Sequence, residues 1–183
     1  MKLTVRSANA TDLAAIHAVH AAAFGNAQGP EIVALVDGLL GDASARPLHS
    51  LVAEVDGRVV GHVLFTAVTI QPGDPDISAQ ILAPLAVLPE VQGKGVGGAL
   101  VNSGLRLLGA AGVVLVFVLG YPDYYSRFGF RPARARGFHA PYAIPAEHDD
   151  AWMVQELRSG VIGRVRGTVR CADTLNDPRH WCE

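Results

Sequence analysis

The stretch from Ile81 to Ala110 reads ILAPLAVLPEVQGKGVGGALVNSGLRLLGA, and the rest of the chain is organised around it. It begins with an apolar run that ends at Pro89. A glycine cluster follows, and apolar residues then recur at helical spacing from Val96 to Leu108. The pattern predicts a buried strand over 78–88, a glycine-rich turn, and an amphipathic helix over 97–111.

The turn holds four glycines within six residues: Gly93, Gly95, Gly97 and Gly98. A helix that begins in such a turn leaves backbone N–H groups free at the positive end of the helix dipole. Because glycine has no Cβ, a ligand can approach this backbone closely. A tight turn alone would need only one or two glycines, so the cluster favours a phosphate-binding site.

The turn does not fully match either of two common phosphate-binding motifs. Gly93, Gly95 and Gly98 match the dinucleotide fingerprint G-x-G-x-x-G, but that fingerprint follows its strand directly and has an acidic residue about 20 residues later. Here residues 89–92 intervene, and Val118 stands at the acidic position. The P-loop pattern fails too, because no Gly-Lys-Ser/Thr follows. A nicotinamide-dependent enzyme is therefore the weakest alternative.

Two blocks of the sequence resemble the GNAT superfamily of N-acyltransferases. The pattern Gln92-x-x-Gly95-x-Gly97, preceded by LAV-x-P over 85–89, is similar to that family's acyl-CoA pyrophosphate loop. The block YYSRFGF over 124–130 resembles the helix and strand start that follow its fifth strand. With a first strand and helix over 3–24, the resemblance covers about residues 3–132. It implies the α/β GNAT-like acyl-CoA N-acyltransferase fold, a central mixed β-sheet with helices on both faces.

The resemblance also implies a function. The expected reaction transfers an acetyl group from acetyl-CoA to a primary amine of a small molecule or peptide, by direct attack in a ternary complex. A bulge near Val87 would free its N–H for the thioester oxygen, and Tyr125, four residues before Gly129, matches the family's general acid. The implied cofactor-binding residues are Leu85, Ala86, Val87, Gln92, Gly93, Lys94, Gly95, Val96, Gly97, Gly98, Gly120, Tyr125 and Phe128.

The sequence departs from the family pattern in two places. Many members carry an Asn seven residues before the tyrosine, where this chain has Val118. Many also carry a Glu in the central strand as general base, but residues 81–88 include no acid. The base candidates that remain are Glu31, Glu54, His62 and Glu90. The missing Glu motivates a second hypothesis, a non-catalytic acyl-CoA-binding module.

Composition excludes several classes of protein. The 183 residues suggest one domain over 1–183, with a core over about 3–132 and a C-terminal extension over 133–183. The net charge is −2 and the basic residues are scattered, so we expect no nucleic-acid partner. The start is not that of a signal peptide, and the longest apolar run, over 113–119, is too short for a membrane span. We expect a cytoplasmic protein with two reduced cysteines; a homodimer, the commonest closed assembly, is compatible with the chain.

The remaining elements follow from local patterns. We predict a strand over 2–6, helices over 12–24 and 30–40 joined by a loop at 25–29, and a hairpin over 50–69 with a type I′ turn at Asp56-Gly57. A buried strand over 113–119 and a short helix over 123–128 come next. Residues 151–156 and 163–171 are expected to pair as closing strands. No spacing among the His, Asp and Cys residues matches a metal site, and His17 and His20 are expected to be ordinary helix positions.

Overall fold

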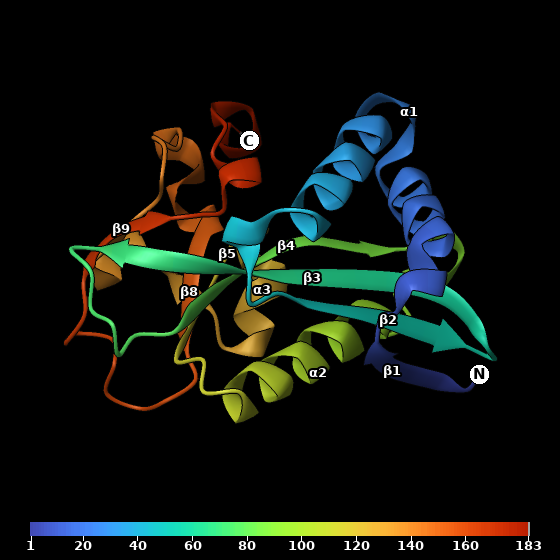
Figure 1. The fold of residues 1–183 in the computed structure, drawn as a ribbon, viewed down its shortest axis with the longest axis horizontal. Helices are drawn as coiled ribbons and strands as arrows, with labels where there is room; N and C mark the ends of the chain where they lie inside the picture. Colours follow the sequence, from blue (N-terminus) through green and yellow to red (C-terminus); the bar gives the residue numbers. More distant parts are fainter. Residues whose placement is uncertain (183) are drawn as a thin grey trace.

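The computed structural model describes residues 1–182. The chain folds into a mixed β-sheet with helices on both faces (Figure 1). The main strand order is β1-β2-β3-β4-β5-β8-β6, and β9 pairs with both β3 and β7. The strands are β1 Leu3–Ser7, β2 His49–Val55, β3 Arg58–Gln71, β4 Ala79–Val87, β5 Leu115–Leu119, β6 Arg131–Pro132, β7 Phe138–His139, β8 Trp152–Glu156 and β9 Gly167–Arg170.

In the described part of the chain three α-helices accompany the sheet: α1 Leu13–Leu40, α2 Val96–Ala110 and α3 Pro122–Tyr125, which continues as a 3₁₀ turn over Ser126–Phe128. Helix α1 is kinked at Gly25, whose φ of 75° and ψ of −176° are not helical. The two predicted helices therefore exist, but the predicted loop over 25–29 is wrong. A single glycine in the left-handed region is enough to break the helix, so no longer connection is needed.

The two long helices cover opposite faces of the sheet, as Figure 1 shows. On one face Leu35 and Leu39 of α1 belong to a core that also contains Phe117 and Trp152. On the other face α2 packs on β3, and a Cβ added at Gly104 would overlap the Phe65 ring. The strand patterns produce this arrangement, because successive side chains of a strand point to opposite faces.

The β2–β3 hairpin has the predicted type I′ turn. Asp56 and Gly57 have φ values of 50° and 84°, and Val55 pairs with Arg58 across them. Both central residues of a type I′ turn require positive φ, which Asp-Gly tolerates well.

The predicted pairing of the two C-terminal strands with each other is wrong. Strand β8 pairs antiparallel with β5, and β9 pairs with the far end of β3. The reason is that β3 is 14 residues long and continues beyond its partner β2, which leaves an edge for β9 to cover. Both strands thus extend the same sheet.

Strand β4 separates from β5 halfway along its length. The parallel pairing joins Ala79–Leu82 of β4 to 115–118 of β5 and then stops. Against β3 the register shifts between Val63 and Phe65, which pair with Leu85 and Leu82. One extra β4 residue is therefore accommodated at Ala83–Pro84. The expected bulge is present but lies three residues before Val87, because Pro84 has no N–H for a regular ladder.

Candidate active site

The N-terminus of α2 presents unbonded backbone amides. Its first helical hydrogen bond runs from the Ala99 N–H to the Gly95 carbonyl at 3.0 Å. The N–H groups of residues 96–98 therefore have no partner within the helix. Gly95 is the N-cap, has a φ of 86° and offers no capping side chain. These amides and the helix dipole together favour an anion at this end.

A cleft of about 270 Å³ lies directly against these amides. Its lining residues come from the glycine turn and from the segment after α3: Gly93, Gly95, Gly97, Gly98, Tyr124, Arg127 and Phe128. Five of them are predicted cofactor-binding residues, which the fold brings together from two segments about 30 residues apart. Lys94 is exposed and does not line the cleft, and the Val96 side chain is buried in the core, so only its backbone faces outward.

Two lining residues, Tyr124 and Arg127, were not among the site residues predicted from the sequence. The Arg127 guanidinium lies 4.6 Å from the centroid of the Tyr124 ring and 5.6 Å from that of Phe128. Burial raises the pKa of Tyr124, and the Arg127 charge partly offsets this shift. A Cβ at Gly97 would overlap the Tyr124 hydroxyl, so Tyr124 contacts the start of α2. Their place in YYSRFGF was the available signal, since Tyr124 lies in α3 beside Tyr125 and Arg127 lies in the 3₁₀ turn that continues this helix.

The backbone of Val87 faces the edge of β4 that β5 has left. The Leu88 N–H bonds to the Val60 carbonyl of β3 at 2.8 Å, and strand geometry turns the polar groups of the preceding residue to the other side. The Val87 carbonyl on that side accepts a hydrogen bond from Gln92 Nε2 at 2.9 Å. The Val87 N–H therefore points into the separation between β4 and β5. A Cβ at Gly97 would lie 3.7 Å from Val87 Cγ2, so this amide is close to the α2 cradle.

Tyr125 lies at the carboxyl end of β5. Its side chain is buried, with 8% of its surface exposed, and its ring contacts those of Tyr124 and Phe130 edge to face. A Cβ at Gly120 would overlap the Tyr125 ring, so this glycine makes room for it. Gly120 is therefore a packing position for the tyrosine, and both follow the strand that separates from β4.

The sequence of residues 4–133 matches the family model described as the acetyltransferase (GNAT) domain. The chain belongs to the GNAT family of N-acetyltransferases. The uncharacterised N-acetyltransferase YjhQ of Escherichia coli is 45% identical over 164 residues, which cover 89% of this chain and 88% of YjhQ. This family assignment removes the nicotinamide-dependent alternative.

Two solved GNAT structures resemble the whole chain. The crystal structure of YhbS from Escherichia coli, in complex with CoA, has a TM-score of 0.85 at 29% identity and covers 97% of this chain and 93% of its own. A GNAT acetyltransferase from Brucella melitensis, in complex with acetyl-CoA, has a TM-score of 0.73 at 30% identity, with coverage of 95% and 98%. The fold, including the mixed sheet with helices, is that of the GNAT family.

Of the four candidate bases of this GNAT enzyme, two are in ion pairs, one is exposed and one is fully buried. Glu54 pairs with Arg6 at 2.7 Å, Glu90 pairs with Arg58 at 3.3 Å, and Glu31 is exposed on α1. His62 is fully buried, and burial lowers its pKa to about 3. Such an imidazole holds a proton poorly at neutral pH, so His62 is unsuited to be the base.

His62 instead belongs to a buried chain of polar side chains. His62 Nδ1 lies 2.8 Å from His20 Nε2, and its Nε2 lies 2.8 Å from Ser50 Oγ. Burial also lowers the pKa of His20, to about 4, and the ring of Phe24 stacks on it. His20 is thus a helix position, as expected, and it is buried in the core where α1 packs on the sheet.

The described residues show neither a metal site nor a membrane helix. Within residues 1–182 no three His, Cys, Asp or Glu side chains gather closely enough to hold a metal ion. In the same part of the chain, no helix combines the length and apolar character that crossing a bilayer requires. Cys171 and Cys182 are both free thiols, and burial raises the pKa of Cys171 to about 12.

Proposed function

We propose that this GNAT enzyme transfers the acetyl group of acetyl-CoA to a primary amine of a small molecule or peptide, by direct attack within a ternary complex. One observation carries the proposal: the β4 edge left open by β5 runs directly to the unbonded amides of α2. This continuous path suits a long co-substrate with a thioester at one end and a pyrophosphate further along. The CoA and acetyl-CoA complexes of the two relatives support the same ligand here.

The reaction requires a free amine and a leaving thiolate. The amine nitrogen attacks the thioester carbon, a C–N bond forms and the C–S bond breaks. The amine loses one proton, and the departing sulfur gains one to give CoA. A lysine-like amine with a pKa of about 10.4 is only about one part in a thousand free base at neutral pH. Because the four candidate bases are paired, exposed or hard to protonate, an ordered-water relay is the proposed route for the amine's proton.

Two groups act on the thioester in this scheme. The Val87 N–H is proposed to donate to the carbonyl oxygen as negative charge develops, a contribution of about 3 kcal/mol for a well-placed donor. Tyr125 is proposed to donate to the thiolate. A phenol has a pKa of about 10 and a thiol about 8.5, so complete proton transfer is uphill by roughly 2 kcal/mol. Tyr125 therefore acts more as a hydrogen-bond donor than as a full acid.

The phosphate end of acetyl-CoA is assigned to the cleft. The amides of residues 96–98 and the glycine turn would bind the pyrophosphate. Arg127, the basic side chain that lines the cleft, would add a charge-assisted contact to a phosphate. Lys94 is exposed beside the turn, and its contact with a phosphate stays a prediction.

A non-catalytic acyl-CoA-binding protein is the second candidate, because β4 carries no acidic side chain. The two candidates share the cleft and differ in turnover. Thermal-shift measurements with acetyl-CoA, CoA and NAD, followed by an amine panel with a colorimetric assay for released thiol, separate them. We expect the CoA compounds to stabilise the protein and at least one amine to accelerate thiol release. Stabilisation by NAD without stabilisation by acetyl-CoA would refute the proposal.

A further inference from the structure

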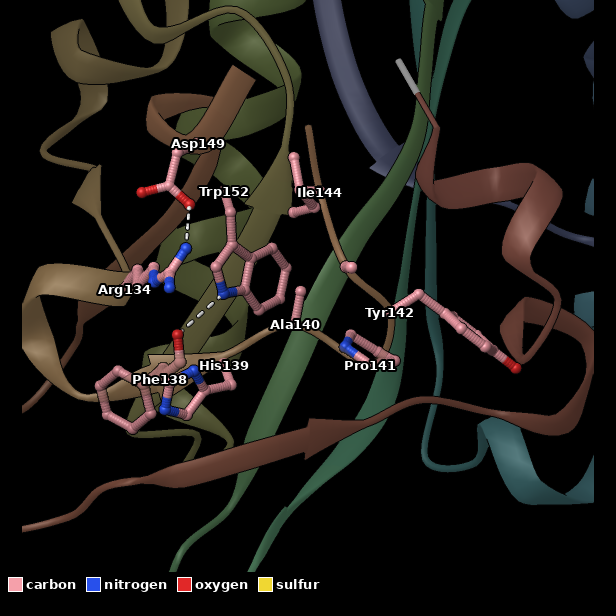
Figure 2. Close-up of a pocket in the computed structure, with 10 residues that line it drawn as sticks. Arg134, Phe138, His139, Ala140, Pro141, Tyr142, Ile144, Asp149 and Trp152 are labelled. Atoms are coloured by element: carbon pink, nitrogen blue, oxygen red, sulfur yellow. Dashed lines mark hydrogen bonds and ion pairs between the residues drawn. The ribbon is translucent and has the colours of Figure 1, made fainter. Parts of the chain in front are cut away.

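A second cavity, of about 260 Å³, is lined by Phe138 and Trp152 among others (Figure 2). These two residues belong to the core on the α1 face of the sheet. Its ten lining residues all fall within 134–152, beyond the residues 4–133 that match the family model. Figure 2 shows the Trp152 indole among the labelled residues, with Arg134 and Asp149 to one side. The cavity thus joins an aromatic wall to a charged rim, and neither belongs to the acetyl-CoA cleft.

The aromatic wall is held rigidly. Trp152 is only 1% exposed, and its Nε1–H donates to the Phe138 carbonyl at 3.1 Å. Its ring stacks on Phe117, with centroids 5.2 Å apart and an interplanar angle of 12°. The edge of the Trp181 ring also contacts Trp152, with centroids 5.6 Å apart, so the indole is the closed floor of the cavity. The partly buried Ala140 and Ile144, which pack on this core and line the cavity, provide the apolar surface that a ligand can reach. Because the floor beneath them is rigid, this surface is preformed.

The charged rim is a weak ion pair. Arg134 Nη1 lies 3.3 Å from Asp149 Oδ1, and the two side chains are 63% and 39% exposed. In residues 1–182 the Arg134 guanidinium makes one hydrogen bond, the contact with Asp149, so its remaining N–H groups face the solvent. An exposed pair with one long contact contributes little to stability and opens easily for a ligand.

The cavity and the proposed site of chemistry meet at the end of β5, on opposite faces of the sheet. Trp152 pairs with Leu119, the last residue of β5, and the Gly120 N–H bonds to the Ala151 carbonyl at 2.9 Å. Gly120 also contacts the Tyr125 ring, which packs on the α2 side of the sheet. The end of β5 therefore carries the cavity wall on one face and Tyr125 on the other, and β5 has separated from β4 at this point.

We propose that this cavity holds the acceptor, and that the acceptor is a free amino acid with an apolar side chain. Its carboxylate pairs with Arg134, its ammonium is first captured by Asp149, and its side chain lies against Ala140 and Ile144, above the Trp152 floor. An α-amino acid presents adjacent opposite charges beside an apolar group, which matches the layout of rim and wall. This inference rests on the proposed acetyl transfer, and the amine must lose its proton before it attacks the thioester carbon.

The test compares leucine and phenylalanine with their amides, which keep the amine and the side chain but lack the carboxylate. Acetylated product is measured by mass spectrometry, and binding to the CoA complex is measured by thermal shift, which needs no turnover. We expect the free acids to bind and react, with the amides weaker by about 10- to 100-fold in kcat/KM.

Matched variants assign the effect to the rim. Arg134→Gln should raise KM for the acids by about 10- to 100-fold and leave the amides unchanged. The control Arg136→Gln alters a neighbouring arginine that bonds to the Pro132 carbonyl outside the cavity. Asp149→Asn is compared with Asp150→Asn in the same way, since Asp150 is exposed and does not line the cavity.

The failures of the two proposals are distinguishable. Amides that equal the acids, or equal effects of Arg134→Gln and Arg136→Gln, overturn the acceptor assignment while acetyl transfer to another amine still stands. Failure of acetyl-CoA to bind, or of every amine to be acetylated, overturns the proposed function itself. Binding of the acids in the thermal-shift assay that is abolished by Arg134→Gln supports the cavity assignment.

Discussion

The buried histidine pair makes the stability of this protein depend on pH. In the folded protein burial lowers the pKa of His20 to about 4 and that of His62 to about 3. The charge of His17 also lowers the pKa of His20, whereas Asp12 acts in the opposite direction on His62. The unfolded chain has ordinary histidines with a pKa of about 6.5 and therefore binds protons first as the pH falls.

The sign and size of the effect follow from this difference. Stability is complete above pH 6.5 and is lost as the pH falls from 6.5 toward the folded-state values. At pH 5 both folded imidazoles are still neutral, so the loss depends mainly on the unfolded pKa. About 1.5 pH units at 1.36 kcal/mol per unit give about 2 kcal/mol for each histidine, or about 4 kcal/mol for the pair.

Urea unfolding at several pH values between 8 and 5 measures this loss. The double variant His20→Leu/His62→Leu should lose about 4 kcal/mol less than the natural protein over the same range. His148→Gln, which removes an exposed histidine, is the control and should keep the natural pH dependence.

Two results would refute the reasoning. Parallel pH profiles of the natural protein and the double variant would mean that the pair titrates normally in the fold. Should the double variant not fold, NMR titration of the natural protein decides the question, because imidazoles that become protonated near pH 6.5 contradict the prediction.

Three further predictions concern the site. Tyr125→Phe should lower kcat by about 10- to 1,000-fold with little change in CoA affinity, whereas Tyr124→Phe should be milder in kcat; steady-state kinetics with equal small effects of the two would make Tyr125 a packing residue. Gly98→Asp should abolish CoA binding in calorimetry, because a Cβ there fits at 3.6 Å from Phe128 but the carboxylate meets the pyrophosphate. Gly109→Asp, in open space on the same helix, is the control, and intact CoA binding to a folded Gly98→Asp would contradict a pyrophosphate site at the start of α2. Arg127→Gln should weaken CoA binding by about 10-fold. An equal loss of affinity for 3′-dephospho-CoA would assign the contact to the pyrophosphate, and a smaller loss would assign it to the 3′-phosphate. If neither compound loses affinity, Arg127 is not part of the site.

The sequence alone was sufficient where the signal was local. The strand, glycine turn and helix over 78–111 form as predicted, because helix periodicity and glycine conformation depend on neighbouring residues. The type I′ hairpin turn at 56–57 is also confirmed. The same local patterns carried the resemblance to the GNAT family, which the family model then confirmed.

Features that depend on distant residues were decided by the tertiary structure. Pro84 interrupts the ladder locally, but the register against β3 and the separation from β5 are long-range features, and they show that the extra residue is accommodated at Ala83–Pro84. His20 and His62, 42 residues apart, became one buried pair only when α1 packed on the sheet. The partners of β8 and β9 depended on which strand edges were left open, and Arg127 reached the cleft because the segment after β5 folds back over the start of α2. Local patterns specify the elements of this protein, whereas long-range packing specifies which side chains meet in its site.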